Sequence, residues 1–168
     1  MASGLVLGRL RAGVGGAAVR FELRFPVPVA ELWSALTVPE RLARWLAPVD
    51  GQRRPGATVR LLFGLDAVAA VTIEDCLPER RLDLRYVFPD GLATRLRAEV
   101  RADGGDSSVL TLDHSGFPGS PVESAAAWQV ALDGLAAELA GRLQAPDPAA
   151  FEELSGLYGS AWRRLTAD

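Results

Sequence analysis

The chain of 168 residues is long enough for one domain with a substantial core and too short for two comfortable ones. Its 49% hydrophobic and 23% charged residues are typical of a soluble globular protein, and its net charge of −3 argues against a nucleic-acid partner. All 18 basic residues are arginine, which excludes lysine chemistry, and a single cysteine with a single histidine excludes a disulfide framework and the usual zinc site, so we expect no metal and no cofactor.

Residues 1–16 are rich in glycine and predict a flexible or extended lead-in. The stretch from Gly13 to Ala18, GVGGAA, fits the G-x-G-x-x-A fingerprint of dinucleotide sites. That fingerprint needs a helix directly after it, whereas VRFELRF alternates apolar and charged residues like a half-buried strand. Arg9 and Arg11 interrupt the apolar stretch of this segment, so we expect no signal peptide and a cytoplasmic location.

Two short helices are predicted after the prolines at positions 26 and 28, which end the strand. VAELWSAL (29–36) has helical spacing of its apolar residues. TVPE (37–40) resembles a capping box, in which Thr37 accepts from a free backbone N–H and Glu40 reaches back. We therefore expect a second helix over ERLARWLA.

Five further strands follow, separated by turn signals. They are predicted over residues 57–63, 69–77, 81–88, 93–101 and 108–114. Consecutive short strands joined by tight turns, such as DGGD at 103–106, are typical of an antiparallel meander with one dry and one wet face. Arg95, Arg97 and Arg101 fall on the wet face, interleaved with Glu99.

A long helix is predicted to begin at Ser120, with Glu123 three residues after this cap. Its apolar stripe comprises Trp128, Leu132, Leu135, Leu139 and Leu143. Pro146 and Pro148 should close it, and a last helix is expected over roughly residues 149–165.

The order of elements favours an α+β fold, in which a curved antiparallel sheet of about six strands wraps around the long helix and leaves a cavity between them. We divide the chain into a lead-in (1–16), a main domain (17–145) and a C-terminal helical extension packed on the same domain (146–168). The apolar runs are too short to span a membrane.

Four local sequences carry a resemblance to a known family. They are FPVPVAELWSALTVPERLARWL (25–46), PERRL (78–82), SSVLTLDHSGF (107–117) and WQVALDGLAAEL (128–139). In this order and spacing, over most of residues 19–143, the chain resembles the START-like (SRPBCC) superfamily. The branch that it resembles is that of the bacterial homologues of the heat-shock-protein-90 ATPase activator.

This resemblance implies the helix-grip fold and a hydrophobic pocket between the sheet and the long helix. It does not imply one reaction, since relatives include lipid and hormone carriers, polyketide cyclases and aromatases, and proteins that confer resistance to toxic natural products. The activator label of the branch rests on shared fold, so we carry over no chaperone role.

Asp113, His114 and Ser115 are adjacent and suggest a hydrolase triad. Successive residues of a strand point to opposite faces, so Asp113 and Ser115 should face away from His114. His114 shares its parity with Leu110 and Leu112 and should point toward the pocket or its rim. We favour a structural histidine whose nitrogens are satisfied by neighbours, and the alternative is a ligand contact or general acid/base.

The candidate ligand-binding residues are the polar or aromatic side chains expected near the pocket, with two leucines of the long helix. They are Trp45, Phe63, Tyr86, Phe88, His114, Trp128, Leu132 and Leu135. No residue stands out as catalytic; the candidates are His114 and Tyr86. We expect Asp75 to be solvated and the thiol of Cys76, which lacks an adjacent base, to be unreactive.

The preferred function is binding of a small hydrophobic or aromatic molecule without a defined catalytic set. The first alternative is a cyclase- or aromatase-like enzyme, or a natural-product resistance protein, that uses His114 and Tyr86. The second is a dimerising or protein-interaction module that uses Tyr158 and Trp162 of the last helix, with a homodimer as the partner.

Overall fold

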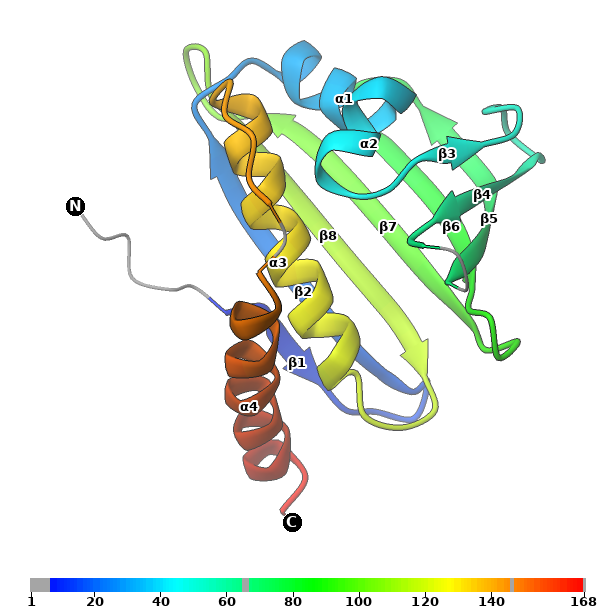
Figure 1. The fold of residues 1–168 in the computed structure, drawn as a ribbon, viewed down its shortest axis with the longest axis vertical. Helices are drawn as coiled ribbons and strands as arrows, with labels where there is room; N and C mark the ends of the chain where they lie inside the picture. Colours follow the sequence, from blue (N-terminus) through cyan, green and yellow to red (C-terminus); the bar gives the residue numbers. More distant parts are fainter. Residues whose placement is uncertain (1–6, 65–66, 146, 168) are drawn as a thin grey trace.

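A computed structural model describes residues 7–64, 67–145 and 147–167. Its strands are β1 (Arg9–Arg11), β2 (Ala17–Phe25), β3 (Val49–Asp50), β4 (Thr58–Leu62), β5 (Val68–Leu77), β6 (Arg81–Val87), β7 (Ala93–Ala102) and β8 (Ser108–Phe117), and its helices are α1 (Val29–Thr37), α2 (Pro39–Trp45), α3 (Val122–Leu139) and α4 (Pro148–Leu165) (Figure 1). The strands form one antiparallel sheet in the order β1-β2-β8-β7-β6-β5-β4-β3. The α+β class and the predicted meander are therefore confirmed.

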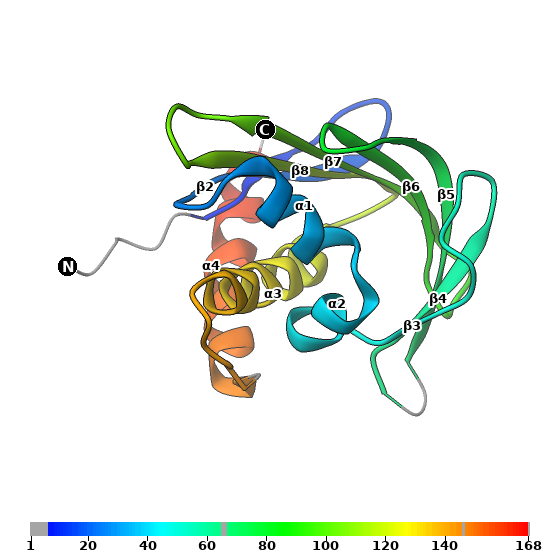
Figure 2. The ribbon, with the colours of Figure 1, turned by 90° about the horizontal axis from the view of Figure 1, so that it is seen from above.

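The sheet curls around the helices, as the predicted helix-grip fold requires. Figure 2 shows α1, α2 and α3 inside the curve, with β3 and β4 brought round toward α2. Alternation along β7 explains why the inner face is dry: Leu96, Ala98 and Val100 are buried, whereas Arg95 and Arg97 are exposed. Burial of the apolar face against α3 is the main source of stability for such a layer pair.

Over the described residues the sheet has eight strands rather than about six, and the two strands that were not predicted are β1 and β3. These two strands have three and two residues, which is too short for an alternation pattern to be read. β1 is joined to β2 by the glycine-rich turn, where the Gly16 N–H donates to the Gly13 carbonyl at 3.0 Å and Gly16 has a φ of 96°. No helix follows this turn, so the dinucleotide fingerprint has no structural counterpart.

Two details of the helix ends differ from the sequence prediction. Thr37 does not cap α2; its hydroxyl donates to the Trp33 carbonyl at 2.8 Å, because Thr37 is still the last residue of α1. α3 ends at Leu139, and Gly141 with a φ of 71° turns the chain away. Leu143 is consequently 85% exposed and does not belong to the apolar stripe.

Arg41 connects the three helices inside the curve. Its guanidinium pairs with Glu31 of α1 at 2.7 Å and with Glu138 of α3 at 3.0 Å. The Glu138 side chain is only 7% exposed, so this pair is screened by solvent much less than a surface pair. The contact fixes how α1 and α2 sit against α3.

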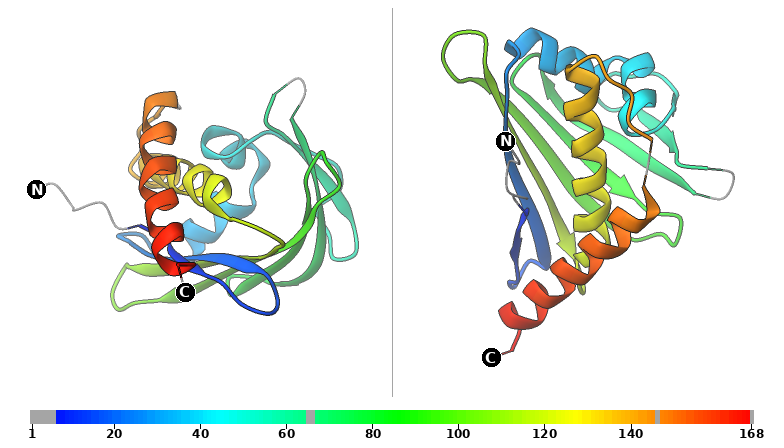
Figure 3. Two further views of the ribbon diagram at one scale, coloured as in Figure 1. Left: turned by 90° about the horizontal axis from the view of Figure 1, so that it is seen from below. Right: turned by 60° about the vertical axis from the view of Figure 1, so that its left-hand side comes forward.

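α4 packs on its own chain, against α3 and β1 (Figure 3). Tyr158 is fully buried; its hydroxyl accepts from the Gly8 N–H at 2.7 Å and donates to Gln129 Oε1 at 2.6 Å. The hypothesis of a dimerising helix relied on Tyr158 being free for a partner and loses that basis. Among the helices that the structure describes, none is long and apolar enough to cross a membrane.

Candidate functional site

A cavity of about 510 Å³ lies between α2, α3, the inner face of the sheet and the segment that leads into α4; we call it the outer cavity. Its walls are mostly apolar and aromatic. They comprise Ala43, Arg44, Trp45, Leu46, Phe63, Tyr86, Phe88, His114, Ser124, Ala127, Trp128, Val130, Ala131, Gly134, Gln144, Ala145, Asp147, Pro148 and Phe151. Phe63 and Phe151 are 46% and 37% exposed and therefore stand at its rim.

A second cavity of about 220 Å³, which we call the inner chamber, lies between the sheet, α1 and α2. Its walls are mainly aliphatic side chains of β4, β5, β6 and both short helices. Leu46, Tyr86 and Trp128 line both cavities and form the boundary between them. A molecule in the outer cavity would therefore touch the side chains that close the inner chamber.

The outer cavity depends on a close approach of α2 to α3. A Cβ on Gly134 would lie 3.5 Å from Trp45 Cβ, so glycine leaves this helix crossing with little spare room. The Trp45 indole is fixed in turn, because its Nε1–H donates to the Ala35 carbonyl of α1 at 2.9 Å. Ala131, one turn earlier on α3, contributes only a methyl group to the wall, and space is left beside it.

His114 is 2% exposed and both of its ring nitrogens are engaged. The indole of Trp128 can only donate, and its Nε1–H lies 2.9 Å from His114 Nδ1, so the ring proton is on Nε2. Nε2 lies 2.7 Å from Thr94 Oγ1, which can then donate to the Tyr86 carbonyl at 3.3 Å. The four groups form a directional chain in which no nitrogen of His114 is left for another partner.

Aromatic rings surround His114 on the sides that the hydrogen bonds leave open. Phe88 is stacked at 6.1 Å with an interplanar angle of 6°, and Phe117 and Tyr86 are tilted at 4.7 and 5.4 Å between centroids. Burial in this environment lowers the pKa of His114 from 6.5 to about 4. The imidazole is therefore neutral near pH 7.

The hydroxyl of Tyr86 is a further polar group at the boundary between the outer cavity and the inner chamber. The residue is 6% exposed, and its hydroxyl makes no hydrogen bond with any residue in the described ranges. Burial raises the pKa of this phenol well above its usual value, so it stays protonated and can donate. The Tyr86 hydroxyl oxygen is not among the fully buried polar atoms that lack a partner, so it is accessible to a molecule in the cavities that Tyr86 lines.

The predicted site residues divide into two groups. Trp45, Phe63, Tyr86, Phe88, His114 and Trp128 line the outer cavity. Leu132 and Leu135 are 2% and 0% exposed and pack in the core instead. Sequence patterns did not reveal the small lining residues of α3, because alanine and glycine give no signal of a cavity wall. They also did not reveal Gln144, Ala145, Asp147, Pro148 and Phe151, which reach the cavity only through tertiary packing.

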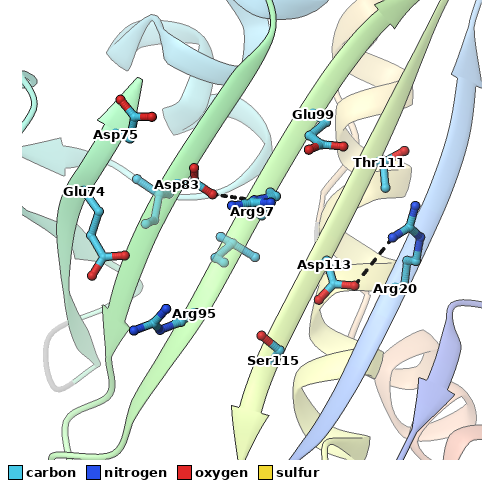
Figure 4. A pocket seen from close by; sticks show the side chains of 12 residues that line it. Arg20, Glu74, Asp75, Asp83, Arg95, Arg97, Glu99, Thr111, Asp113 and Ser115 are labelled. Carbon is cyan, nitrogen blue, oxygen red and sulfur yellow. Dashed lines mark hydrogen bonds and ion pairs between the residues drawn. The ribbon is translucent and has the colours of Figure 1, made fainter. Parts of the chain in front are cut away.

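Asp113 and Ser115 lie on the opposite face of the sheet from His114, as predicted. They line a hollow of about 500 Å³ whose other walls are largely charged (Figure 4). Asp113 pairs with Arg11 at 2.7 Å and with Arg20 at 3.9 Å. The carboxylate is thus neutralised by arginines of β1 and β2 and cannot orient the imidazole.

The remaining candidates are occupied or inert. Asp75 is half-exposed and pairs with Arg81 at 2.8 Å, and Asp83 pairs with Arg97 at 2.6 Å on the wet face. Burial, with the nearby charge of Asp75, raises the pKa of the Cys76 thiol and makes it a weak nucleophile. Over the described part of the chain, no group of three or more His, Cys, Asp or Glu side chains is placed to hold a metal ion.

Comparisons with known proteins agree with this fold. The sequence model of the family described as "Activator of Hsp90 ATPase homolog 1-like protein" matches residues 26–140. The crystal structure of CalU16 from Micromonospora echinospora is similar over 95% of both chains, with 27% identity and a TM-score of 0.75. DynU16, a protein in the dynemicin biosynthetic locus, is 29% identical over 75% of this chain and 48% of its own, with a TM-score of 0.69.

A more distant structure, the conserved protein of unknown function EF2215 from Enterococcus faecalis, is 15% identical with a TM-score of 0.76 and shows the fold alone. The search of curated proteins gave no match. The family model covers more than half of the chain, and the resemblance predicted from the local sequences is confirmed. The chain belongs to the Activator of Hsp90 ATPase homolog 1-like protein family, within the START-like superfamily.

Proposed function

We propose that this protein binds a small apolar or aromatic molecule in the outer cavity and does so without catalysing a reaction. The single observation that carries the proposal is the cavity itself, about 510 Å³ with mainly aromatic and apolar walls. Its volume falls within the roughly 300–1,000 Å³ of small-molecule sites, which have few polar groups placed among apolar ones. The fold of the family is of a ligand-binding type.

The polar groups of the walls support recognition of an aromatic molecule with an acceptor. Tyr86 supplies a protonated hydroxyl without a hydrogen-bond partner among the described residues, on the boundary of the two cavities. Trp45, Phe88 and Trp128 supply ring faces and edges for stacking. The similarity to DynU16, which is encoded in a biosynthetic locus, supports a natural product as the ligand class.

The engagement of His114 argues for binding rather than for a cyclase-like reaction. A general acid or base needs a nitrogen within reach of the reacting atom, whereas Trp128 and Thr94 occupy both. Its pKa of about 4 also leaves almost no protonated imidazole near pH 7. His114 is therefore assigned to hold the indole of Trp128 against the cavity.

The proposal is tested by a substitution on α3 whose larger side chain fills the outer cavity. Ala131→Trp places an indole in the cavity, and Ala136→Trp, on the exposed side of the same helix, is the matched control. Titration with the neutral dye Nile red, whose emission rises in an apolar site, should give at least about tenfold weaker binding for Ala131→Trp than for the control. Equal affinities in two variants with native circular dichroism would contradict the proposal.

A further inference from the structure

The inner chamber has an apolar body and a basic opening. Its walls are mainly aliphatic residues of the sheet and the two short helices, among them Leu42, Val59 and Leu61, which are at most 9% exposed. The aromatic side chains of Trp33, Tyr86 and Trp128 complete the walls. Arg53 and Arg54, in the loop between β3 and β4, line the same chamber but are exposed. Two side chains that both line a chamber and reach solvent mark its opening.

The two arginines differ in their partners. The Arg53 guanidinium donates to the Thr37 carbonyl at the end of α1 and is held there. The Arg54 carbonyl accepts from the Ala57 N–H at 3.0 Å, but its guanidinium makes no hydrogen bond or ion pair with any residue of the described ranges. None of the described residues that line the chamber is acidic, so its opening carries uncompensated positive charge.

A ligand that fits both the apolar walls and the basic opening of the inner chamber has an alkyl chain with an anionic end. A water molecule occupies roughly 30 Å³ in the liquid, so a chamber of 220 Å³ has room for a short alkyl chain. The aliphatic walls favour a saturated chain over a ring, and a guanidinium pairs with a carboxylate through two parallel hydrogen bonds.

We infer that the inner chamber takes the alkyl chain of a carboxylic acid whose carboxylate lies against Arg54. This inference rests on the proposed function and assigns a chemical class to the part of the ligand that the inner chamber would hold. From Arg54, the alkyl chain of the ligand extends through the inner chamber to the boundary formed by Leu46, Tyr86 and Trp128, where the outer cavity begins. A ligand that fills both cavities therefore has an aromatic or apolar group in the outer cavity and an alkyl chain that ends in a carboxylate in the inner chamber.

The test uses the single cysteine of the chain as a reporter. Cys76 lines the inner chamber and is partly exposed. Its raised pKa makes alkylation by iodoacetamide slow, and a ligand in the chamber should slow it further relative to the ligand-free protein, as measured by mass spectrometry. The probes are octanoate, 1-octanol and octylamine, which share one chain length and differ in charge. Octanoate should protect Cys76 at a concentration roughly tenfold lower than 1-octanol, and octylamine should protect least.

The variant Arg54→Gln isolates the charge, and Arg85→Gln, an exposed arginine of β6 without an ion pair in the described ranges, is the matched control. Arg54→Gln should abolish the preference for octanoate over 1-octanol, and Arg85→Gln should leave it unchanged. Equal protection by the three probes, protection by none, or an unchanged preference in Arg54→Gln would overturn the inference. Nile red binding in the outer cavity is measured in the same samples, so failure of the inference is distinguishable from failure of the proposed function.

Discussion

The stability of the protein should fall between about pH 7 and about pH 5, because His114 is buried in its neutral form. The ring contacts Tyr86, Phe88, Phe117 and Trp128 and bonds to Thr94 and Trp128, and none of these described groups carries charge in this range. Protonation would place a cation among aromatic rings and would remove the acceptor that Trp128 uses. Protonation of His114 is therefore less favourable in the folded state than in the unfolded chain.

The magnitude follows from the two pKa values of His114. Burial lowers the pKa in the folded state to about 4, whereas in the unfolded chain it is near 6.5. The unfolded state binds more protons between these values, so this contribution is complete above about pH 6.5 and is lost as the pH falls toward 4. Linkage gives a loss of about 2 kcal/mol between about pH 7 and pH 5, and about 3 kcal/mol over the whole window.

Urea unfolding at a series of pH values measures this loss, and His114→Gln is the reference. The amide of glutamine can accept from Trp128 and donate to Thr94 but does not titrate. The carboxylates titrate in both proteins, so the difference between the two curves isolates His114, the single histidine of the chain. A wild-type free energy of unfolding that falls no more than that of His114→Gln would refute the assignment of a buried neutral imidazole.

Three further changes test the packing around the site by urea unfolding at neutral pH. Tyr158→Phe should cost about 1–3 kcal/mol, since it removes two buried hydrogen bonds, one of them to Gln129; a cost near zero would contradict the anchoring of α4. Gly134→Ala should add about 0.5–1 kcal/mol, because the new Cβ makes an ordinary contact at 3.5 Å in a helix interior; destabilisation would mean that α2 lies closer. Glu138→Gln should cost about 1–3 kcal/mol even at high salt, because Arg41 loses a buried carboxylate, whereas a loss that disappears with salt would indicate a surface pair.

Alternation along single strands was enough to predict the inner face of the sheet. Leu110, Leu112 and His114 share one parity in β8, and all three are at most 4% exposed. The same alternation correctly predicted that Asp113 and His114 lie on opposite faces of the sheet. A period of two is a local property of the chain, so a sequence alone determines it.

The partners of His114 could not be predicted, because they depend on tertiary contacts. Thr94 reaches it through the register of β7 with β8, in which Leu96 lies opposite His114, and Trp128 through the docking of α3. A cavity between the sheet and the long helix was predicted, and Trp45, Tyr86 and Trp128 are among the predicted residues that line it. Its extent along α3 could not be predicted, since that volume comes from small side chains such as Ala131. β1 and β3 were not predicted for a simpler reason, because strands of two or three residues are too short to show an alternation of apolar and polar side chains.

NMR of the four tryptophan indoles shows whether an aromatic molecule occupies the outer cavity. Trp45 and Trp128 line this cavity, whereas Trp162 lies outside it, on α4. On titration with 1-naphthol, a small neutral aromatic, we expect the Nε1–H signals of Trp45 and Trp128 to shift, with little change at Trp162. Saturable binding that leaves both of these signals in place, or that shifts Trp162 alone, would contradict this expectation.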